Sequence, residues 1–319
     1  MTEHGQRVDR SAPAPLGRSA VYRGRLRDGR LLDSRPRARL LTWLRALLTS
    51  RAARAEAELD RRLAEGQRRP TRANLVAVAS PKGGVGKTTC TLLAGDALCE
   101  LARLRCVAVD ANPDYGTLGS LAADELRSER SLADVLAGLD RLDAAAALRP
   151  FVSPLPSGLH LLAAPREARA MAELSADDYR RLTDALARFY DVVLLDLGTG
   201  LTDPLARLAL ERADQALLVA TPEWVTAERV LAALDDLGGT LAAASTTLVL
   251  NQAPAERAAD RQLIEAAFRR AEVGRRIAIP YDPRLRAMLD AGAYRLAELE
   301  RPTRVPVKEL ALRIAEALR

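Results

Sequence analysis

A glycine-rich segment with two lysines is the part of this sequence best suited to chemistry. The segment reads Ser80-Pro81-Lys82-Gly83-Gly84-Val85-Gly86-Lys87-Thr88-Thr89. It follows the apolar run 75–79 and precedes an apolar-periodic stretch over 91–104, so the pattern predicts a strand, a loop and then a helix. Backbone N–H groups of such a loop can surround a phosphate, and the helix start adds a positive dipole. Lys87 would then supply positive charge to the β- and γ-phosphates, and the Thr88 hydroxyl would coordinate Mg²⁺.

The distribution of lysine sets this loop apart from the rest of the chain. Of 48 basic residues only three are lysines, namely Lys82, Lys87 and Lys308. A compact ammonium and a planar guanidinium are not interchangeable beside phosphates, so two lysines within one loop indicate a function. Lys87 is the expected phosphate lysine, whereas Lys82 is one more than an ordinary phosphate-binding loop needs.

The run from Lys82 to Thr89 resembles the deviant Walker A motif of the ParA/MinD family of ATPases. The resemblance implies that Lys82 reaches across an ATP-sandwiched homodimer to the partner's nucleotide, as both a binding and a catalytic residue. It also implies that the whole run binds the nucleotide, through Lys82, Gly83, Gly84, Val85, Gly86, Lys87, Thr88 and Thr89. Pro81 stands where the general P-loop pattern has its first glycine, a departure that this family tolerates.

Carboxylates follow two other apolar runs. Asp196 ends the run 192–195, and the segment 196–200 resembles the Walker B and switch II segment of the same family. Asp110 follows a second run, in a segment that resembles switch I. A carboxylate at the tip of a buried strand near a P-loop is well placed to hold Mg²⁺, so Thr88, Asp110 and Asp196 are the predicted metal-site residues.

The switch I segment departs from the family pattern at one position. The family commonly has a second aspartate two positions after the first, where this chain has Asn112. An amide can hold a water molecule by hydrogen bonds but cannot accept its proton as a carboxylate can. Asp114 is the alternative carboxylate, given a different loop path. We therefore take Asp110, Asn112 and Asp114 with Lys82 as the catalytic candidates and expect slow hydrolysis.

The base contacts are predicted from two later strand ends. The chain lacks the N/T-K-x-D pattern of guanine-specific P-loop proteins, because Asn251 is followed by Gln-Ala-Pro. The resemblance implies that Asn251 contacts adenine and that Pro280, within the segment 279–282, closes over the base; the alternative for Asn251 is a turn residue. The predicted cofactors are therefore ATP and Mg²⁺.

Alternating strands and helices predict an α/β fold over residues 74–319. Short apolar runs at 75–79, 105–110, 159–163, 191–196, 216–221, 247–251 and 276–280 lack polar alternation, as expected of strands covered on both faces. Helical patterns lie between them, for example over 177–189, 225–237 and 257–271. The prediction is a doubly wound, mostly parallel sheet of the P-loop NTPase, ParA/MinD-like class, with an N-terminal helical extension.

That extension concentrates the positive charge. Residues 1–72 hold 18 Arg against 8 acidic residues, whereas the remainder holds 30 basic against 34 acidic residues. We expect a disordered basic tail over 1–36, an amphipathic helix over 37–65 and a linker over 66–73. The helix would lie on a membrane surface or, alternatively, pack on its own domain or a dimer partner. Non-specific DNA binding through arginines such as Arg269, Arg270, Arg275, Arg276, Arg301 and Arg304 is the other docking hypothesis.

Composition narrows the functional classes. Three cysteines, all before residue 107 and without a CxxC pair, argue against an iron–sulfur carrier or scaffold and for reduced thiols in the cytoplasm. No apolar run reaches the roughly 18 residues of a spanning helix, so membrane or nucleoid association would be peripheral. A tyrosine kinase of polysaccharide synthesis would end in a tyrosine cluster, and no tyrosine follows Tyr294.

The function that these features favour is an ATP-dependent dimerisation switch. Such a protein would bind and slowly hydrolyse Mg-ATP, form a homodimer on ATP, and answer to a macromolecular activator. Its cargo would be a chromosome or plasmid, cell-division or polar machinery, or a secretion complex. The last possibility follows from segments 109–114 and 196–200, which resemble an actinobacterial ParA/MinD-like branch with a basic N-terminal extension, some members of which are associated with secretion. The alternatives are an interaction module with negligible hydrolysis and a small-molecule ATP-dependent synthetase on the same fold.

Overall fold

The computed structural model describes residues 51–65, 70–112, 116–201, 203–236, 246–253, 258–270, 273 and 275–318. All of them belong to one compact unit, 51–319, and residues 1–50 form the other. The predicted tail over 1–36, the first half of the predicted helix over 37–50, residues 66–69 of the linker and Asp114 therefore lie outside the described residues.

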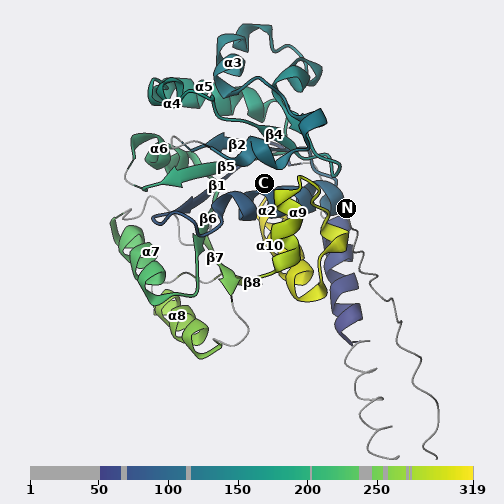
Figure 1. Cartoon of the computed structure of the whole chain (residues 1–319), viewed down its shortest axis with the longest axis vertical. Helices are drawn as coiled ribbons and strands as arrows, with labels where there is room; N and C mark the ends of the chain where they lie inside the picture. The colour runs from purple at the N-terminus through teal and green to yellow at the C-terminus, as the bar shows by residue number, and fades with distance from the viewer. Residues whose placement is uncertain are drawn as a thin grey trace, which may run out of the picture. The chain divides into compact units, whose positions relative to one another are not determined.

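An eight-stranded sheet forms the centre of the described unit (Figure 1). Its order is β3-β4-β2-β5-β1-β6-β7-β8, and every pairing is parallel except that of β3 with β4. The strands are β1 (Asn74–Ser80), β2 (Cys106–Ala111), β3 (Ser153–Pro154), β4 (His160–Leu162), β5 (Val192–Thr199), β6 (Gln215–Ala220), β7 (Thr246–Ala253) and β8 (Arg275–Pro280). In an open parallel sheet the ligand site lies beyond the carboxyl ends of the strands, where the order reverses around β1.

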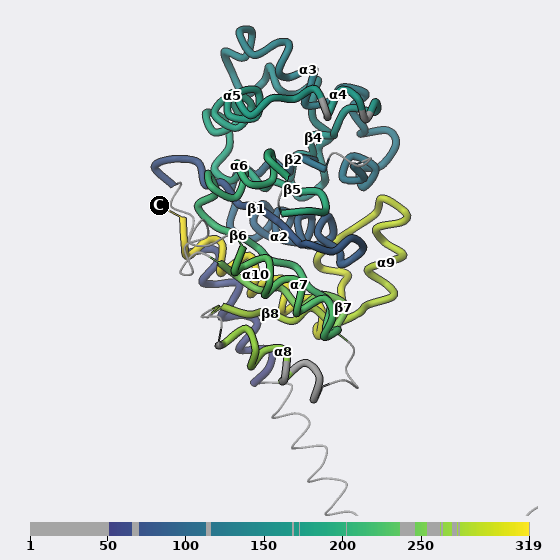
Figure 2. The backbone as a smooth tube through the Cα atoms, turned by 90° about the vertical axis from the view of Figure 1, so that its left-hand side faces the viewer, coloured from purple at the N-terminus to yellow at the C-terminus, as the bar shows by residue number. Residues whose placement is uncertain are grey.

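Helices cover both faces of the sheet, because alternate residues of the strands point to opposite sides. Val76 and Val78 of β1 face a core built with α2 (Lys87–Ala102), α9 (Pro283–Asp290), α10 (Arg301–Glu316) and the helical residues 51–65. Ala77 and Ala79 face a second core. The helices of this side are α3 (Leu132–Ala137), α4 (Ala168–Ala172), α5 (Ala176–Ala187), α6 (Pro204–Arg212), α7 (Trp224–Asp236) and α8 (Ala258–Arg270). Figure 2 turns the side that carries α6 and α7 toward the viewer.

The doubly wound, mostly parallel sheet confirms the predicted fold class. The seven predicted strands lie within three residues of the observed boundaries, because uninterrupted apolar runs are typical of strands buried on both faces. Between β2 and β5 the sequence pattern predicted β4 and α5, but it did not predict the two-residue edge strand β3 or several short helical turns. These turns are Leu118–Leu121, Asp124–Leu126, Leu139–Arg141 and Ala145–Phe151; a fifth, Leu296–Glu298, precedes α10.

The helical residues 51–65 pack on α10 (Figure 1). Leu63 is fully buried in the core, and Glu56 accepts hydrogen bonds from Arg304 Nε at 2.7 Å and Lys308 Nζ at 3.0 Å. This half of the predicted amphipathic helix therefore packs on its own domain, as the alternative interpretation expected. Among the described residues, no helix is long and apolar enough to cross a bilayer.

Candidate nucleotide-binding site

The predicted phosphate-binding loop connects β1 to α2 at the centre of the sheet. Gly86 precedes α2 with φ of 91°, a left-handed conformation that favours glycine. A Cβ atom at this position would also lie 2.1 Å from Asn251 Nδ2, so a side chain cannot be accommodated. The Asn251 amide in turn donates to the Val85 carbonyl at 2.8 Å and braces the loop. The loop conformation thus depends on a glycine and on a side chain from β7.

Lys87 and Thr88 open helix α2 at the loop. The Lys87 side chain is buried, and this burial lowers the pKa of its ammonium, although the nearby Asp196 carboxyl acts in the opposite direction. A desolvated ammonium is stabilised by an anion that can replace its lost hydration. Thr89 is half-buried in the same turn. The residues at the start of α2 are therefore arranged to receive a phosphate.

Asp196 lies on β5 next to this helix and is almost completely buried. Thr88 Oγ1 donates to Asp196 Oδ2 at 2.6 Å, whereas Asp196 Oδ1 is buried and has no hydrogen-bond partner. Burial raises the pKa of Asp196 to about 7, and the Asp110 carboxyl contributes in the same direction. An orphaned carboxylate oxygen in such a site is costly, and a divalent cation would satisfy it.

Asp110 is the last residue but one of β2 and lies directly opposite Asp196 in the strand register. It accepts backbone hydrogen bonds from Leu118 at 3.0 Å and Asn112 at 3.3 Å, while burial raises its pKa to about 6. A Cβ atom at Gly116 would lie 2.1 Å from the Asp110 oxygens, so the chain wraps closely around this carboxyl. The described residues contain no cluster of three or more His, Cys, Asp or Glu side chains that could hold a metal. Mg²⁺ usually takes one or two carboxylates and keeps several waters, and the Thr88 hydroxyl with the Asp110 and Asp196 carboxyls would suit such an ion.

The second lysine of the loop turns toward α7 of its own subunit. Lys82 Nζ lies 3.0 Å from Glu223 Oε2 and 3.1 Å from Thr226 Oγ1. Its side chain is 36% exposed and that of Glu223 is 54% exposed, so this ion pair is open to solvent. Sequence reasoning missed Glu223 and Thr226. They follow β6, the strand beside β1, and this adjacency is visible only once the strand order is known.

The two predicted base-contact residues lie at the ends of neighbouring strands. Asn251 is buried against the loop, and Pro280 pairs in register with Ala253 across β7 and β8. Gln252, the residue after Asn251, adopts φ of 57°, and its side-chain amide nitrogen lies 3.5 Å from the Gly84 carbonyl oxygen. Asn251 therefore supports the P-loop in this structure, and its contact with adenine remains a prediction.

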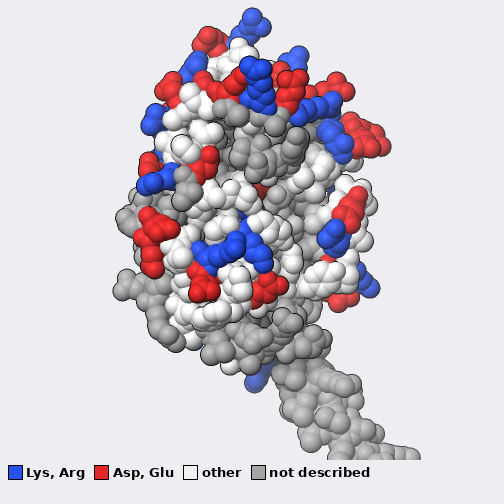
Figure 3. Space-filling model, turned by 60° about the vertical axis from the view of Figure 1, so that its left-hand side comes forward, with Lys and Arg blue, Asp and Glu red and all other residues white. Residues whose placement is uncertain are grey.

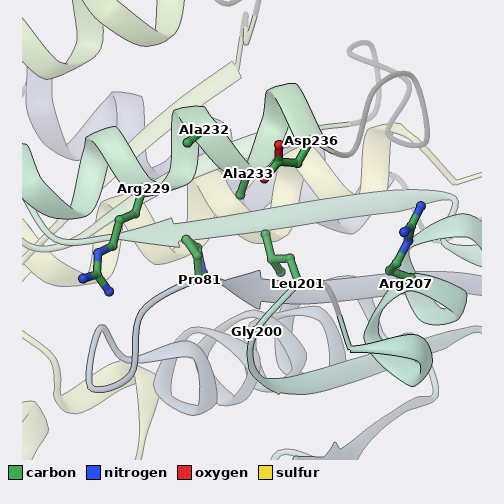
Figure 4. A pocket seen from close by; sticks show the side chains of 8 residues that line it. All are labelled: Pro81, Gly200, Leu201, Arg207, Arg229, Ala232, Ala233 and Asp236. Carbon is green, nitrogen blue, oxygen red and sulfur yellow. The ribbon is translucent and has the colours of Figure 1, made fainter.

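A cavity of about 380 Å³ opens beside the loop, at Pro81 (Figure 4). Pro81 and Leu201 contribute apolar surface to it, and α7 forms one wall. The lining residues are Pro81, Gly200, Leu201, Arg207, Arg229, Ala232, Ala233 and Asp236. The cavity thus joins the start of the P-loop, the predicted switch II segment and the exposed side of α7.

The arginines considered for DNA binding do not form one free surface. Arg301 and Arg304 are ion-paired with Glu56 of the N-terminal helix. Arg275 and Arg276 are half-buried on β8, Arg269 is exposed on α8, and the Arg270 side chain lies outside the described residues. Two of the six arginines are thus ion-paired with a residue of the same chain.

Comparisons with known proteins agree with this geometry. A protein-family profile described as an AAA domain matches residues 73–238, which is about half of the chain. The ESX-1 secretion-associated protein EspI of Mycobacterium tuberculosis is 32% identical over 226 residues, covering 69% of this chain and 34% of EspI. The septum site-determining protein MinD of Synechocystis is 32% identical over 169 residues, covering 51% of this chain and 61% of MinD. The chain thus spans about a third and three-fifths, respectively, of these curated relatives.

Solved structures show the same fold. A ParA family ATPase from Chlorobium tepidum superposes with a TM-score of 0.64 at 24% identity, covering 75% of this chain and 98% of that one. MinD from Pyrococcus horikoshii, solved in complex with Mg-ADP, superposes with a TM-score of 0.58 at 22% identity, covering 75% and 94%. Both likenesses cover three quarters of this chain, and at this identity they show the fold.

Proposed function

We propose, since this chain belongs to the ParA/MinD family of P-loop ATPases, that it works as a nucleotide-operated dimerisation switch. Mg-ATP would hold two copies together, and hydrolysis would release them. The observation that carries the proposal is the pairing of a buried Lys87 with a second, solvent-accessible Lys82 in one loop, beside two buried carboxylates. Lys87 would bind the nucleotide of its own subunit, and Lys82, which Glu223 and Thr226 hold only through exposed or half-exposed contacts, would serve another.

The metal-site residues support the nucleotide part of this proposal. Thr88, Asp110 and Asp196 would hold Mg²⁺, which neutralises charge on the β- and γ-phosphates when bound. Thr88 already donates to Asp196, so its hydroxyl is oriented at the site before any ion arrives. The chain's own contribution is therefore a preformed pair of carboxylates and a braced loop.

The Lys82–Glu223 contact supports the switching part. An ion pair between exposed side chains stabilises a protein by about 1 kcal/mol or less, because water screens it. A triphosphate is a stronger partner for an ammonium, since it carries more negative charge than a single carboxylate. Lys82 would therefore exchange Glu223 of its own subunit for the partner's nucleotide at little cost. ATP can drive dimerisation only as far as it prefers the dimer, and this exchange supplies such a preference.

Nucleotide binding is tested first by titration with a fluorescent ATP analogue. Lys87→Ala should abolish binding, while Lys308→Ala, which removes the one lysine outside the loop, should leave the affinity unchanged. Sedimentation of the wild type should then show a dimer with Mg-ATP and a monomer with ADP. A wild type that binds Mg-ATP and stays monomeric at saturation would contradict the switch and leave a simple nucleotide binder.

A nucleotide-binding module with negligible hydrolysis is the second candidate, and Asn112 is the observation that favours it. Asn112 is half-buried next to Asp110, where the family commonly has a second aspartate. Restoring a carboxylate with Asn112→Asp should raise single-turnover hydrolysis at least about tenfold, because a carboxylate can accept the proton of the attacking water. Hydrolysis that is absent in both proteins would favour the module, while fast and equal hydrolysis would remove Asn112 from the mechanism.

The class of cargo that we propose is inferred from the names of the relatives. EspI is named as secretion-associated and MinD as septum site-determining. We propose that this chain likewise acts on a macromolecular complex, with an activator that stimulates its ATP turnover. A synthetase on the same fold would instead respond to a small molecule. Adding cell fractions to a turnover assay, before and after removal of small molecules by dialysis, distinguishes the two.

A further inference from the structure

The exposed side of α7 carries two opposite charges that have no partner in the part of the chain that the structure describes. Arg229 and Asp236 are both exposed, and neither makes a hydrogen bond or ion pair among the described residues. Seven residues separate them, which is almost two full turns and about 10 Å along the helix. They therefore point to the same side of α7. Figure 4 shows them on this helix, with Ala232 and Ala233 between them.

The middle of this side is formed by small residues. Ala232 is exposed and Ala233 is half-buried, and both line the cavity beside the P-loop. Small side chains let two helix backbones approach to the short end of the usual 8–10 Å packing distance. A second helix can therefore lie closely against α7 at this point, with the two charges on either side of the contact.

We infer that α7 is a self-complementary surface whose partner is α7 of a second copy of this chain, in antiparallel orientation. A two-fold axis between Ala232 and Ala233 would place Arg229 opposite the partner's Asp236, and Asp236 opposite the partner's Arg229. An interface on a two-fold axis must pair one surface with itself, and two opposite charges equidistant from a small-residue centre meet this requirement. The contact therefore contains the same ion pair twice.

The surroundings of α7 place this contact beside Lys82. The helix begins at Trp224, one residue after the Glu223 that holds Lys82, and Trp224 and Val225 are 56% and 58% exposed. Exposed large apolar side chains next to an unpaired helix face are typical of an interaction surface. Figure 3 shows basic and acidic side chains close together on this side of the molecule, within a larger uncharged area. The inference rests on the proposed function, because the contact would form in the ATP-bound dimer.

Charge reversal gives a direct test, since the pair occurs twice. Arg229→Asp alone brings like charges together at both positions of a homodimer, and so does Asp236→Arg alone. Each variant should dimerise with Mg-ATP at least about tenfold more weakly than the wild type, equivalent to about 1.4 kcal/mol. A 1:1 mixture of the two variants should restore the dimer, because each then meets a partner of opposite charge. The double variant Arg229→Asp/Asp236→Arg should also restore it.

The readout is sedimentation velocity with a non-hydrolysable ATP analogue and Mg²⁺, over a concentration series. Binding of a fluorescent ATP analogue should be the same in all variants, and their melting temperatures should match that of the wild type. The exposed Asp177 and Arg180 of α5 offer a matched control: Arg180→Asp and Asp177→Arg should not weaken the dimer and should show no rescue on mixing.

Two outcomes would overturn the inference in distinguishable ways. A wild type that dimerises with ATP while both single variants dimerise equally well would refute the α7 contact and leave the proposed function intact. The same conclusion would follow if the single variants were weakened but neither the mixture nor the double variant recovered. A wild type that binds ATP and remains monomeric would refute the proposed function and the α7 contact together.

Discussion

The carboxylate of Glu56 and the carboxylates of Asp110 and Asp196 lie in opposite electrostatic environments. Glu56 is surrounded by Arg301, Arg304 and Lys308, and the Arg304 hydrogen bond in particular lowers the pKa of Glu56 to about 2. Asp110 and Asp196 are buried at the P-loop, where desolvation raises their pKa values to about 6 and about 7. Three basic side chains thus surround Glu56, whereas Asp110 and Asp196 are two neighbouring acids that repel each other.

The difference separates residues that hold the fold together from residues that await a ligand. The Glu56 cluster joins the helical residues 51–65 to α10, so its charges are compensated within the chain. At the P-loop, one Asp196 oxygen is left without any hydrogen bond. Such a buried, unsatisfied oxygen is typical of a functional site, where a bound group compensates for the cost of its burial; here a divalent cation would do so. The predictions below use this contrast, from the largest expected effect to the smallest.

Removing the charge of Asp196 should have the largest effect. Asp196→Asn should weaken Mg²⁺-dependent ATP binding roughly 100-fold, since loss of a residue that orients a metal's ligands typically costs 10–100-fold in affinity. The same change should make the nucleotide-free protein more stable at pH 8, because it removes a buried charge. Titrations of a fluorescent ATP analogue with and without Mg²⁺, together with thermal melts, measure both effects. The exposed Asp177→Asn is the control. Unchanged Mg²⁺ dependence would contradict the assignment.

Removing Glu56 should destabilise the protein without affecting the site. Glu56→Ala leaves Lys308 and Arg304 without their shared partner, and breaking a buried ion pair on one side costs about 3 kcal/mol. Urea unfolding should show this loss, while ATP affinity stays that of the wild type. Glu58→Ala, on the same helix but in an exposed pair with Arg61, should cost far less than Glu56→Ala, because water screens the exposed pair. Equal effects of the two changes would show that the cluster is not structural.

The two groups should give opposite responses to pH. The Asp110 and Asp196 carboxyls have raised pKa values in the folded state, so their contribution to stability is lost as pH rises from about 4 through 6–7. Glu56 has a lowered pKa, so its contribution is present above about 4.5 and is lost as pH falls toward 2. The free energy of unfolding of the nucleotide-free protein should therefore fall between pH 5 and pH 8. Saturating Mg-ATP should offset this fall, and Asp196→Asn should flatten it. An unchanged slope in that variant would contradict the pKa assignment.

The exposed ion pair of Lys82 should contribute least to stability. Glu223→Gln removes its charge, and the free energy of unfolding should fall by no more than about 1 kcal/mol, because both side chains are accessible to water. Urea unfolding of the variant beside Glu56→Ala measures the contrast within one experiment. A loss as large as that of Glu56→Ala would mean that Lys82 is fixed to its own subunit.

The fold and the position of the site could be predicted because they depend on local patterns. Apolar runs predict buried parallel strands, and a residue at the end of such a run must lie at the ligand edge of the sheet. Asp110, Asp196 and the loop met at this edge as expected. No sequence pattern places Asn251 against Val85, which it contacts across 166 residues, although the strand end itself was predicted.

The partners of Lys82 and Lys308 could not be predicted, since both contacts join distant segments. Lys82 meets Glu223 across 141 residues, and Lys308 meets Glu56 across 252 residues. The scarcity of lysine indicated a function at Lys82 and Lys87, whereas at Lys308 it led to no prediction. Lys308 is 8% exposed and touches two carboxylates, Glu56 and Asp60, in a space suited to a compact ammonium.

The proposal as a whole depends on whether Lys82 acts on the partner's nucleotide. Sedimentation velocity of Lys82→Ala with Mg-ATP, beside the wild type, tests this most directly. We expect the variant to bind ATP with an affinity like that of the wild type and to remain a monomer at concentrations where the wild type is dimeric. An ATP-dependent dimer of Lys82→Ala, as stable as that of the wild type, would contradict the account.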